Sequence, residues 1–231
     1  MKNNKIKSPF FVINPKSFLD RKTSLEMARH ANDIAKNYEI DVLFTAPFTE
    51  LADIVRDCPN LIVTAQHVDD IQPGDAMGKT SIDSLAQVGV KAVVLNHANH
   101  PLSTSALTNT IQHAKEKGIQ TIVCADSVLE AKAIAILQPD VVLAEPTELI
   151  GKEQISSRNY VTSTIQAIKT VNQNVLIEQG AGIRTEKDVK ELMDLGADGV
   201  GVTSGIVKAN NPLDMMEKMI RTVAKFKNGG K

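Results

Sequence analysis

Three side chains suited to proton transfer or charge stabilisation follow short apolar stretches of the 231-residue chain: Lys16, His97 and Glu145. Each stretch is too short for a helix and rich in Val, Ile, Leu or Phe, which is typical of a buried strand. A carboxylate can serve as a general base, an imidazole as a proton shuttle, and an ammonium as a counter-charge for a developing oxyanion. The three residues therefore predict acid–base chemistry if their strands end at one place.

Each of these residues also has a structural interpretation. Glu145 could cap its strand or the following turn, Lys16 could be a solvated loop lysine, and His97 could be a hydrogen-bonded loop histidine. The remaining histidines are expected to be structural, because none so clearly ends a strand at the position of Glu145: His30, His67, His100 and His113. The fold has to decide between these interpretations.

Two glycine-containing turns indicate an anion site. The first is Gly180-Ala181-Gly182-Ile183 and the second is Thr203-Ser204-Gly205. Backbone N–H groups at Gly182 and Gly205 can approach an anion closely, and each turn leads into a predicted helix. One such turn alone is typical of a mere tight turn, but two after the last two strands of a barrel predict a phosphate site.

The elements that must position these residues alternate between strand and helix. Pro212 opens the final predicted helix, and a short helix is expected after Pro47. Eight strands are predicted: 10–13, 42–44, 61–63, 92–95, 121–123, 141–143, 175–177 and 199–202. This alternation predicts a (β/α)₈ TIM barrel of the α/β class, with a doubly wound open sheet as the alternative.

Length and composition favour one domain over residues 1–231 that acts on a small molecule. Apolar residues make up 42% of the chain and aromatic residues 3%, which suits parallel strands packed under helices. The formal net charge of −1 lacks the basic block of a nucleic-acid-binding protein. No stretch has the length of a signal peptide or a membrane span, so we expect a cytoplasmic protein.

The sequence predicts neither a metal site nor a cofactor. Cys58 and Cys124 have no metal or redox spacing and are expected to be reduced thiols. No nucleotide-binding fingerprint is present either.

Six ordered motifs resemble the compact, archaeal-type triosephosphate isomerases over nearly the whole chain. They are Asn14-x-Lys16, Gln66-His67 with Pro73-Gly74, Leu95-Asn96-His97, the segment 145–151, the turn 180–183 and the segment 204–208. The resemblance implies that Glu145 removes a proton next to the substrate carbonyl and returns it to the neighbouring carbon. It also implies that His97 acts as a neutral imidazole, and that Lys16, assisted by Asn14, holds the substrate.

The same resemblance implies how a phosphate is held and shielded. Backbone N–H groups at Gly151, Gly182, Ser204 and Gly205 would bind the phosphate of a small phosphorylated sugar, next to Gly180, Ala181 and Thr203. The polar segment 146–157 would form a lid, because an enediolate phosphate readily expels its phosphate in water. A homo-oligomer, a dimer or tetramer, is also implied.

The chain departs from the family pattern in three places. After the histidine the family usually has Ser and Glu, then Arg, whereas this chain has Ala98-Asn99-His100-Pro101. The lid tip has Gly151-Lys152-Glu153 in place of Gly-Thr-Gly, and the loop 74–79 lacks the usual Thr. Two alternatives therefore stand beside a triosephosphate isomerase. They are an isomerase of a related phosphorylated ketose, such as a tetrulose phosphate, and a phosphate-binding relative of low activity.

Overall fold

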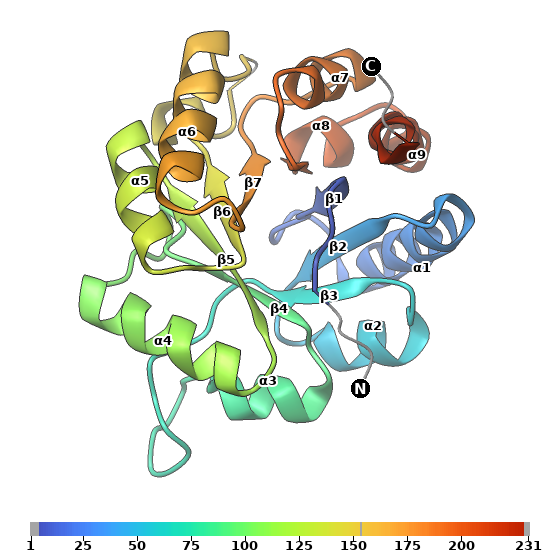
Figure 1. Ribbon diagram of the computed structural model, residues 1–231. Helices are drawn as coiled ribbons and strands as arrows, with labels where there is room; N and C mark the ends of the chain where they lie inside the picture. Colours follow the sequence, from blue (N-terminus) through green and yellow to red (C-terminus); the bar gives the residue numbers. More distant parts are fainter. Residues whose placement is uncertain (1–4, 153, 229–231) are drawn as a thin grey trace.

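A closed barrel of eight parallel strands forms the centre of the protein (Figure 1). The computed structural model describes residues 5–152 and 154–228. Strands pair in sequence order and β1 pairs with β8, so the sheet has no free edge. The strands are β1 Phe10–Ile13, β2 Asp41–Ala46, β3 Ile62–Ala65, β4 Ala92–Leu95, β5 Gln120–Ala125, β6 Val141–Ala144, β7 Leu176–Gln179 and β8 Gly199–Val202. The predicted (β/α)₈ barrel is confirmed, and closure excludes the open doubly wound sheet.

Helices surround the barrel. They are α1 Arg21–Tyr38, α2 Leu51–Asp57, α3 Ile82–Val88, α4 Thr104–Glu116, α5 Val128–Ile136, α6 Arg158–Val171, α7 Glu186–Asp194, α8 Ser204–Val207 and α9 Pro212–Ala224, with the 3₁₀ segments η1 Thr147–Leu149 and η2 Lys225–Asn228. Many begin after a Ser, Thr, Asp or Asn whose side chain accepts a first-turn N–H, as Thr185 does at α7. Among the described residues, none of these helices has the length and apolarity needed to cross a membrane.

Alternate residues of each strand enter two different cores. Phe10 and Val12 of β1 lie in a cluster with Leu43, Val94 and Ile122, which fills the barrel interior. Their neighbours, such as Phe11, pack in the larger cluster between strands and helices. Both faces are buried, which explains why the strands read as continuous apolar runs.

Several strands extend further toward their carboxyl ends than predicted. The sequence prediction ended β2 at Phe44 and β7 at Ile177, whereas the ladders continue through Thr45 and through Glu178 and Gln179. Apolar runs mark strands by their burial, but the hydrogen-bonded ladder accepts polar residues at the barrel mouth. Polar side chains are thus buried inside this end of the barrel.

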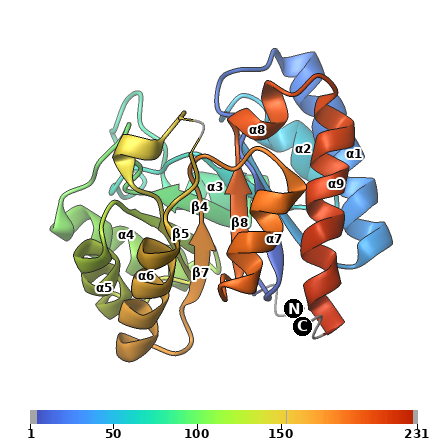
Figure 2. The ribbon, with the colours of Figure 1, turned by 90° about the horizontal axis from the view of Figure 1, so that it is seen from above.

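The carboxyl ends of all eight strands lie on one side of the barrel. In Figure 2, β7 and β8 point toward the side on which α8 lies. The loops that carry Lys16, His97 and Glu145 therefore meet there, as the strand order requires. One barrel accounts for the described residues, and the predicted domain limits at residues 1 and 231 lie outside them.

Candidate active site

Glu145 follows β6 directly and continues its ladder, because its backbone N–H donates to the carbonyl of Ala125 at 2.9 Å. Only 16% of its side chain is exposed. Burial raises the pKa of Glu145, while the charge of Lys16 and a hydrogen bond from the backbone of Ala181 oppose that rise. A carboxylate with a raised pKa is a stronger base than an exposed one.

His97 lies 3.9 Å from this carboxylate, measured from its Nε2 to Oε2 of Glu145. Its other ring nitrogen, Nδ1, accepts the backbone N–H of Asn99 at 3.1 Å. A neutral ring that accepts at Nδ1 carries its proton on Nε2, so the hydrogen-bond network assigns this tautomer. Burial, followed by the charge of Lys16, lowers the pKa of His97. The site thus holds a neutral imidazole that can donate from Nε2.

Lys16 reaches the same point from the loop after β1. Its Nζ lies 3.4 Å from Nε2 of His97. Both nitrogens carry protons in the assigned state, so neither accepts a hydrogen bond from the other. They can therefore donate together to one oxygen atom.

The backbone of Lys16 is held in a left-handed conformation, with φ of 49°. Such a conformation costs a non-glycine residue about 1–3 kcal/mol. The side-chain oxygen of Asn14 accepts the Lys16 N–H at 3.0 Å, and Gln66 Nε2 donates to the Lys16 carbonyl at 3.1 Å. Asn14 therefore positions the lysine, as does Gln66, which sequence reasoning had quoted only as part of a motif.

A cavity on the side of the glycine turns, the anion-side cavity, adjoins Lys16 and Glu145. Ala181 and Gly182 have successive left-handed conformations, with φ of 66° and 69°. Because Gly182 has no Cβ, its backbone can closely approach an anion bound in this cavity. The lining includes predicted residues from three loops: Gly151, Ala181, Gly182, Thr203 and Ser204.

The remaining predicted glycines lie around this cavity in different ways. Gly180 and Glu145 both line a separate cavity inside the barrel mouth, the inner cavity. Gly205 is buried and is not among the residues that line the anion-side cavity. A Cβ at Gly205 would overlap the carbonyl of Ile183, so its absence lets α8 pack closely on the loop after β7. Gly205 thereby brings Ser204 next to Gly182.

The lid prediction falls on η1 and the residues around it. The loop begins anchored, because the Thr147 N–H donates to Asp126 Oδ1 at 2.6 Å. Further along, a Cβ at Gly182 would overlap the carbonyl of Gln154, so lid and glycine turn are in close contact. Glu153 of the predicted lid tip lies outside the described residues, and closure of the segment stays a prediction.

Glu178 is a residue of this site that sequence reasoning missed. It projects from β7 into the barrel and lines the inner cavity with Lys16, His97 and Glu145. Burial, followed by the charge of Glu145, raises the pKa of Glu178 to about 8. Its Oε2 has no hydrogen-bond partner among the described residues. At neutral pH this carboxyl is therefore mostly protonated.

The sequence did contain a signal for Glu178. It lies two residues after Leu176, which packs against the barrel-interior cluster, and side chains two apart in a strand share a face. A Cβ at Gly201 would overlap the Glu178 carboxyl, so this glycine of β8 makes the necessary room. Lys208, which the sequence motifs included without a role, lines the anion-side cavity with its ammonium 5.6 Å from the ring centroid of Phe18.

Comparisons with known proteins agree with this geometry. A family model described as triosephosphate isomerase matches residues 9–221. The chain is 36% identical over 220 residues to the triosephosphate isomerase of Methanocaldococcus jannaschii. The aligned region covers 93% of this chain and 98% of the relative. The chain is 35% identical over 223 residues to the enzyme of Methanobrevibacter smithii, with 92% and 99% covered. For the enzyme of Archaeoglobus fulgidus the identity is 33% over 214 residues, with 90% and 96% covered. The chain belongs to the triosephosphate isomerase family.

Proposed function

We propose that this protein interconverts dihydroxyacetone phosphate and D-glyceraldehyde 3-phosphate through an enediolate. The observation that carries the proposal is the meeting of a carboxylate, a neutral imidazole and an ammonium beside an anion-sized cavity. Moving a carbonyl between adjacent carbons requires a base for a carbon-bound proton and donors for two oxygens. The relatives named triosephosphate isomerase support the same reaction.

Glu145 acts as the base in this proposal. It takes a proton from the carbon next to the substrate carbonyl and returns it to the neighbouring carbon. Burial that raises its pKa favours proton uptake, and the charge of Lys16 keeps the carboxylate available. The protonated carboxyl of Glu178 beneath it adds no second negative charge at neutral pH.

His97 and Lys16 stabilise the charge that develops on the substrate oxygens. His97 donates from Nε2 and passes a proton between the two oxygens, while the Lys16 ammonium attracts the enediolate. The Asn99 N–H at Nδ1 favours the neutral ring, since a protonated Nδ1 could not accept it. The side chain of Asn14 positions the lysine, because its oxygen accepts the backbone N–H of Lys16.

The phosphate of the substrate binds at the glycine turns. Backbone N–H groups of Gly151, Gly182 and Ser204 donate to it, and Gly205 shapes the start of α8 on which Ser204 lies. Lys208 adds a positive charge to the same cavity. The segment 146–157 closes over this cavity, which keeps water from the enediolate and prevents loss of phosphate.

A turnover assay on purified protein tests the proposal. Wild-type protein and Glu145→Ala are compared on triose phosphates and on a tetrulose phosphate. We expect turnover of triose phosphates that depends on Glu145, because the relatives favour the triose over the tetrulose alternative. A triose phosphate rate no higher than that of Glu145→Ala would refute the proposed function.

Binding of phosphoglycolate, which mimics the enediolate, separates an isomerase from a phosphate-binding relative of low activity. A site complementary to the transition state binds such a mimic more tightly than inorganic phosphate. Equal affinity for the two anions would favour the binding-only alternative.

We further propose that the chain assembles into a homo-oligomer, a dimer or tetramer. The loop between β3 and α3 extends away from the barrel (Figure 1) and carries Met77 with 95% of its surface exposed. Burial of this side chain by a neighbouring copy would remove an unfavourable apolar exposure. Light scattering during size-exclusion chromatography measures the mass, and a monomer at micromolar concentration would contradict this proposal. Location in the cytoplasm stays a prediction from the sequence.

A further inference from the structure

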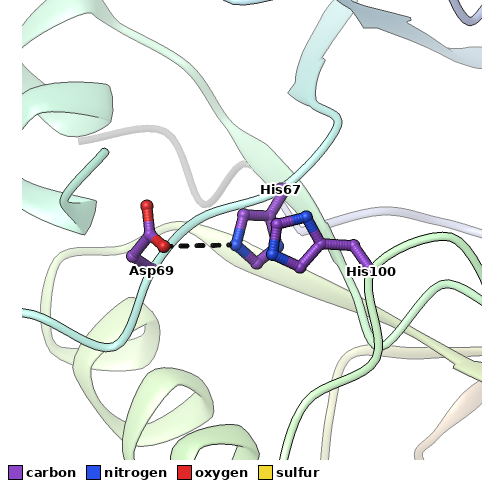
Figure 3. Close-up of side chains that lie close together, drawn as sticks. All are labelled: His67, Asp69 and His100. Atoms are coloured by element: carbon purple, nitrogen blue, oxygen red, sulfur yellow. Dashed lines mark ion pairs between the residues drawn. The ribbon is translucent and has the colours of Figure 1, made fainter. Parts of the chain in front are cut away.

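Two histidines and an aspartate gather beside the catalytic group without belonging to it. His67 and Asp69 follow β3, and His100 lies in the loop after β4 (Figure 3). One ligand atom from each lies within 4.8 Å of the other two. The cluster joins two loops that are distant in sequence, so no spacing motif could predict it.

Among the described residues, one buried ring nitrogen of His67 makes no hydrogen bond. Its Nε2 is enclosed and makes no hydrogen bond within the described residues. Asp69 Oδ1 lies 3.7 Å from this nitrogen, which is too far for a direct hydrogen bond. A buried polar atom in this state costs about 1–3 kcal/mol unless another group binds it. The missing hydrogen bond at this nitrogen therefore indicates a ligand.

Asp69 presents a free oxygen to this nitrogen. Its Oδ2 accepts the backbone N–H of Thr80 at 2.8 Å, and its own N–H donates to the Thr80 carbonyl at 2.9 Å. These bonds fix the carboxylate and leave Oδ1 facing His67. Hydrogen bonds of this kind orient metal-binding carboxylates.

The His100 ring completes the cluster from the solvent side. It stacks on the His67 ring, with centroids 3.5 Å apart and planes at 21°. A metal ion lies in the plane of each imidazole that binds it, so two stacked rings cannot bind one ion without a tilt. Because His100 is exposed, its ring is free to make that tilt while the buried His67 stays in place.

We propose that His67, Asp69 and His100 form a binding site for a divalent cation of the zinc class. Two imidazoles and one carboxylate are a ligand set that zinc prefers, and a tetrahedral zinc ion brings its ligand atoms to about 3.3 Å from one another. The 3.7 Å between His67 and Asp69 is close to this separation. Magnesium and calcium prefer all-oxygen sites and fit less well.

The electrostatic surroundings support the same ligands. Zinc binds the neutral form of imidazole, and Nε2 of the buried His67 lies 3.7 Å from the carboxylate of Asp69. A bound ion would also compensate the charge of Asp69, which the neutral His67 does not. The cluster thus carries a carboxylate and an unpartnered imidazole that a cation would satisfy together.

The proposed ion would lie close to the catalytic histidine. The His100 N–H donates to the carbonyl of His97 at 2.7 Å, and both histidines line one cavity with Lys16 and His67. Fixing the His100 ring would therefore restrain the short turn that begins at His97. The binding itself needs no substrate, so it can be tested apart from the isomerase activity.

Metal titration of the whole purified chain, first freed of metal with a chelator, tests this inference. Calorimetry measures zinc binding, and visible absorption of added Co²⁺ reports tetrahedral nitrogen and oxygen ligands. We expect one ion per chain for the wild type. His100→Ala and Asp69→Asn should each weaken zinc binding by at least about tenfold.

The matched control is His30→Ala. His30 also lies 3.7 Å from a carboxylate, that of Glu217. Among the described residues, this pair is not part of a group of three side chains that could hold a metal ion. This variant should bind zinc as the wild type does. Equal loss in His30→Ala, or wild-type affinity in both His100→Ala and Asp69→Asn, would overturn the proposal.

The two test variants are chosen so that folding does not decide the result. The amide oxygen of Asp69→Asn can still accept the Thr80 N–H, and the exposed His100 contributes little buried surface. Circular dichroism of the metal-free variants checks their fold. If Asp69→Asn does not fold, the comparison of His100→Ala with His30→Ala decides alone.

Discussion

Replacing Glu178 by Gln should make the stability of the barrel less sensitive to a rise in pH than that of the wild type. Glu178 is 2% exposed, and burial followed by the charge of Glu145 raises its pKa to about 8 in the folded state. In the unfolded chain a glutamate has a pKa of 4.5. The folded state therefore holds this proton more tightly, and ionisation favours unfolding.

The sign and size of the effect follow from these two values. A raised folded-state pKa contributes stability below pH 4.5, and this contribution is lost as the pH rises through about 8. The difference of about 3.5 pH units, at 1.36 kcal/mol per unit, corresponds to about 5 kcal/mol in total. Between about pH 5.5 and pH 8 the loss is about 3 kcal/mol. Glutamine does not ionise, so Glu178→Gln escapes this loss.

Urea unfolding at several pH values measures the prediction. The free energy of unfolding of wild type minus that of Glu178→Gln should fall steadily from about pH 5.5 to pH 8. Glu26→Gln, which removes an exposed carboxylate, gives the baseline. Parallel pH dependence of wild type and Glu178→Gln would refute the reasoning, because it would mean that Glu178 ionises equally easily in both states.

Three further predictions concern catalysis and phosphate binding. Glu145→Asp moves the carboxylate by roughly an ångström, so kcat should fall by about a hundredfold while KM changes little, and unchanged kcat in steady-state assays would exclude Glu145 as the base. Gly182→Ala should weaken competitive inhibition by inorganic phosphate and lower the melting temperature, because φ is +69° there and a Cβ would overlap the Gln154 carbonyl. Wild-type inhibition would contradict that assignment. Asn99→Glu, which restores the carboxylate usual in the family, should raise kcat on triose phosphates. A fall in kcat without a gain on another phosphosugar would contradict this account of position 99.

The positions of Lys16, His97 and Glu145 could be predicted because parallel strands fix their direction. Once eight strand–helix units are recognised, residues that follow strands must share one side of the barrel. This prediction needs only the order of strands and helices, and it requires no knowledge of side-chain contacts. The turns at Gly182 and Ser204 could be placed at the same mouth for the same reason.

Features that depend on side-chain depth could not be predicted in the same way. Glu178 lay beyond the predicted end of its strand, since the polar Glu178-Gln179 pair interrupts the apolar run. Its burial requires the missing side chain of Gly201, which comes from the neighbouring strand. Likewise, the pairing of His67 with His100 depends on two loop conformations. Long-range packing, absent from local patterns, decided each of these cases.

Deuterium exchange tests the central claim, proton transfer by Glu145, most directly. Dihydroxyacetone phosphate is incubated in D₂O with wild-type protein or with Glu145→Gln, and proton NMR follows the carbon next to the carbonyl. The wild type should introduce deuterium at that carbon of the remaining dihydroxyacetone phosphate and at the neighbouring carbon of the glyceraldehyde 3-phosphate that it forms. Glu145→Gln should not exceed the rate without enzyme. Exchange by Glu145→Gln at the wild-type rate would contradict the assignment of Glu145 as the base.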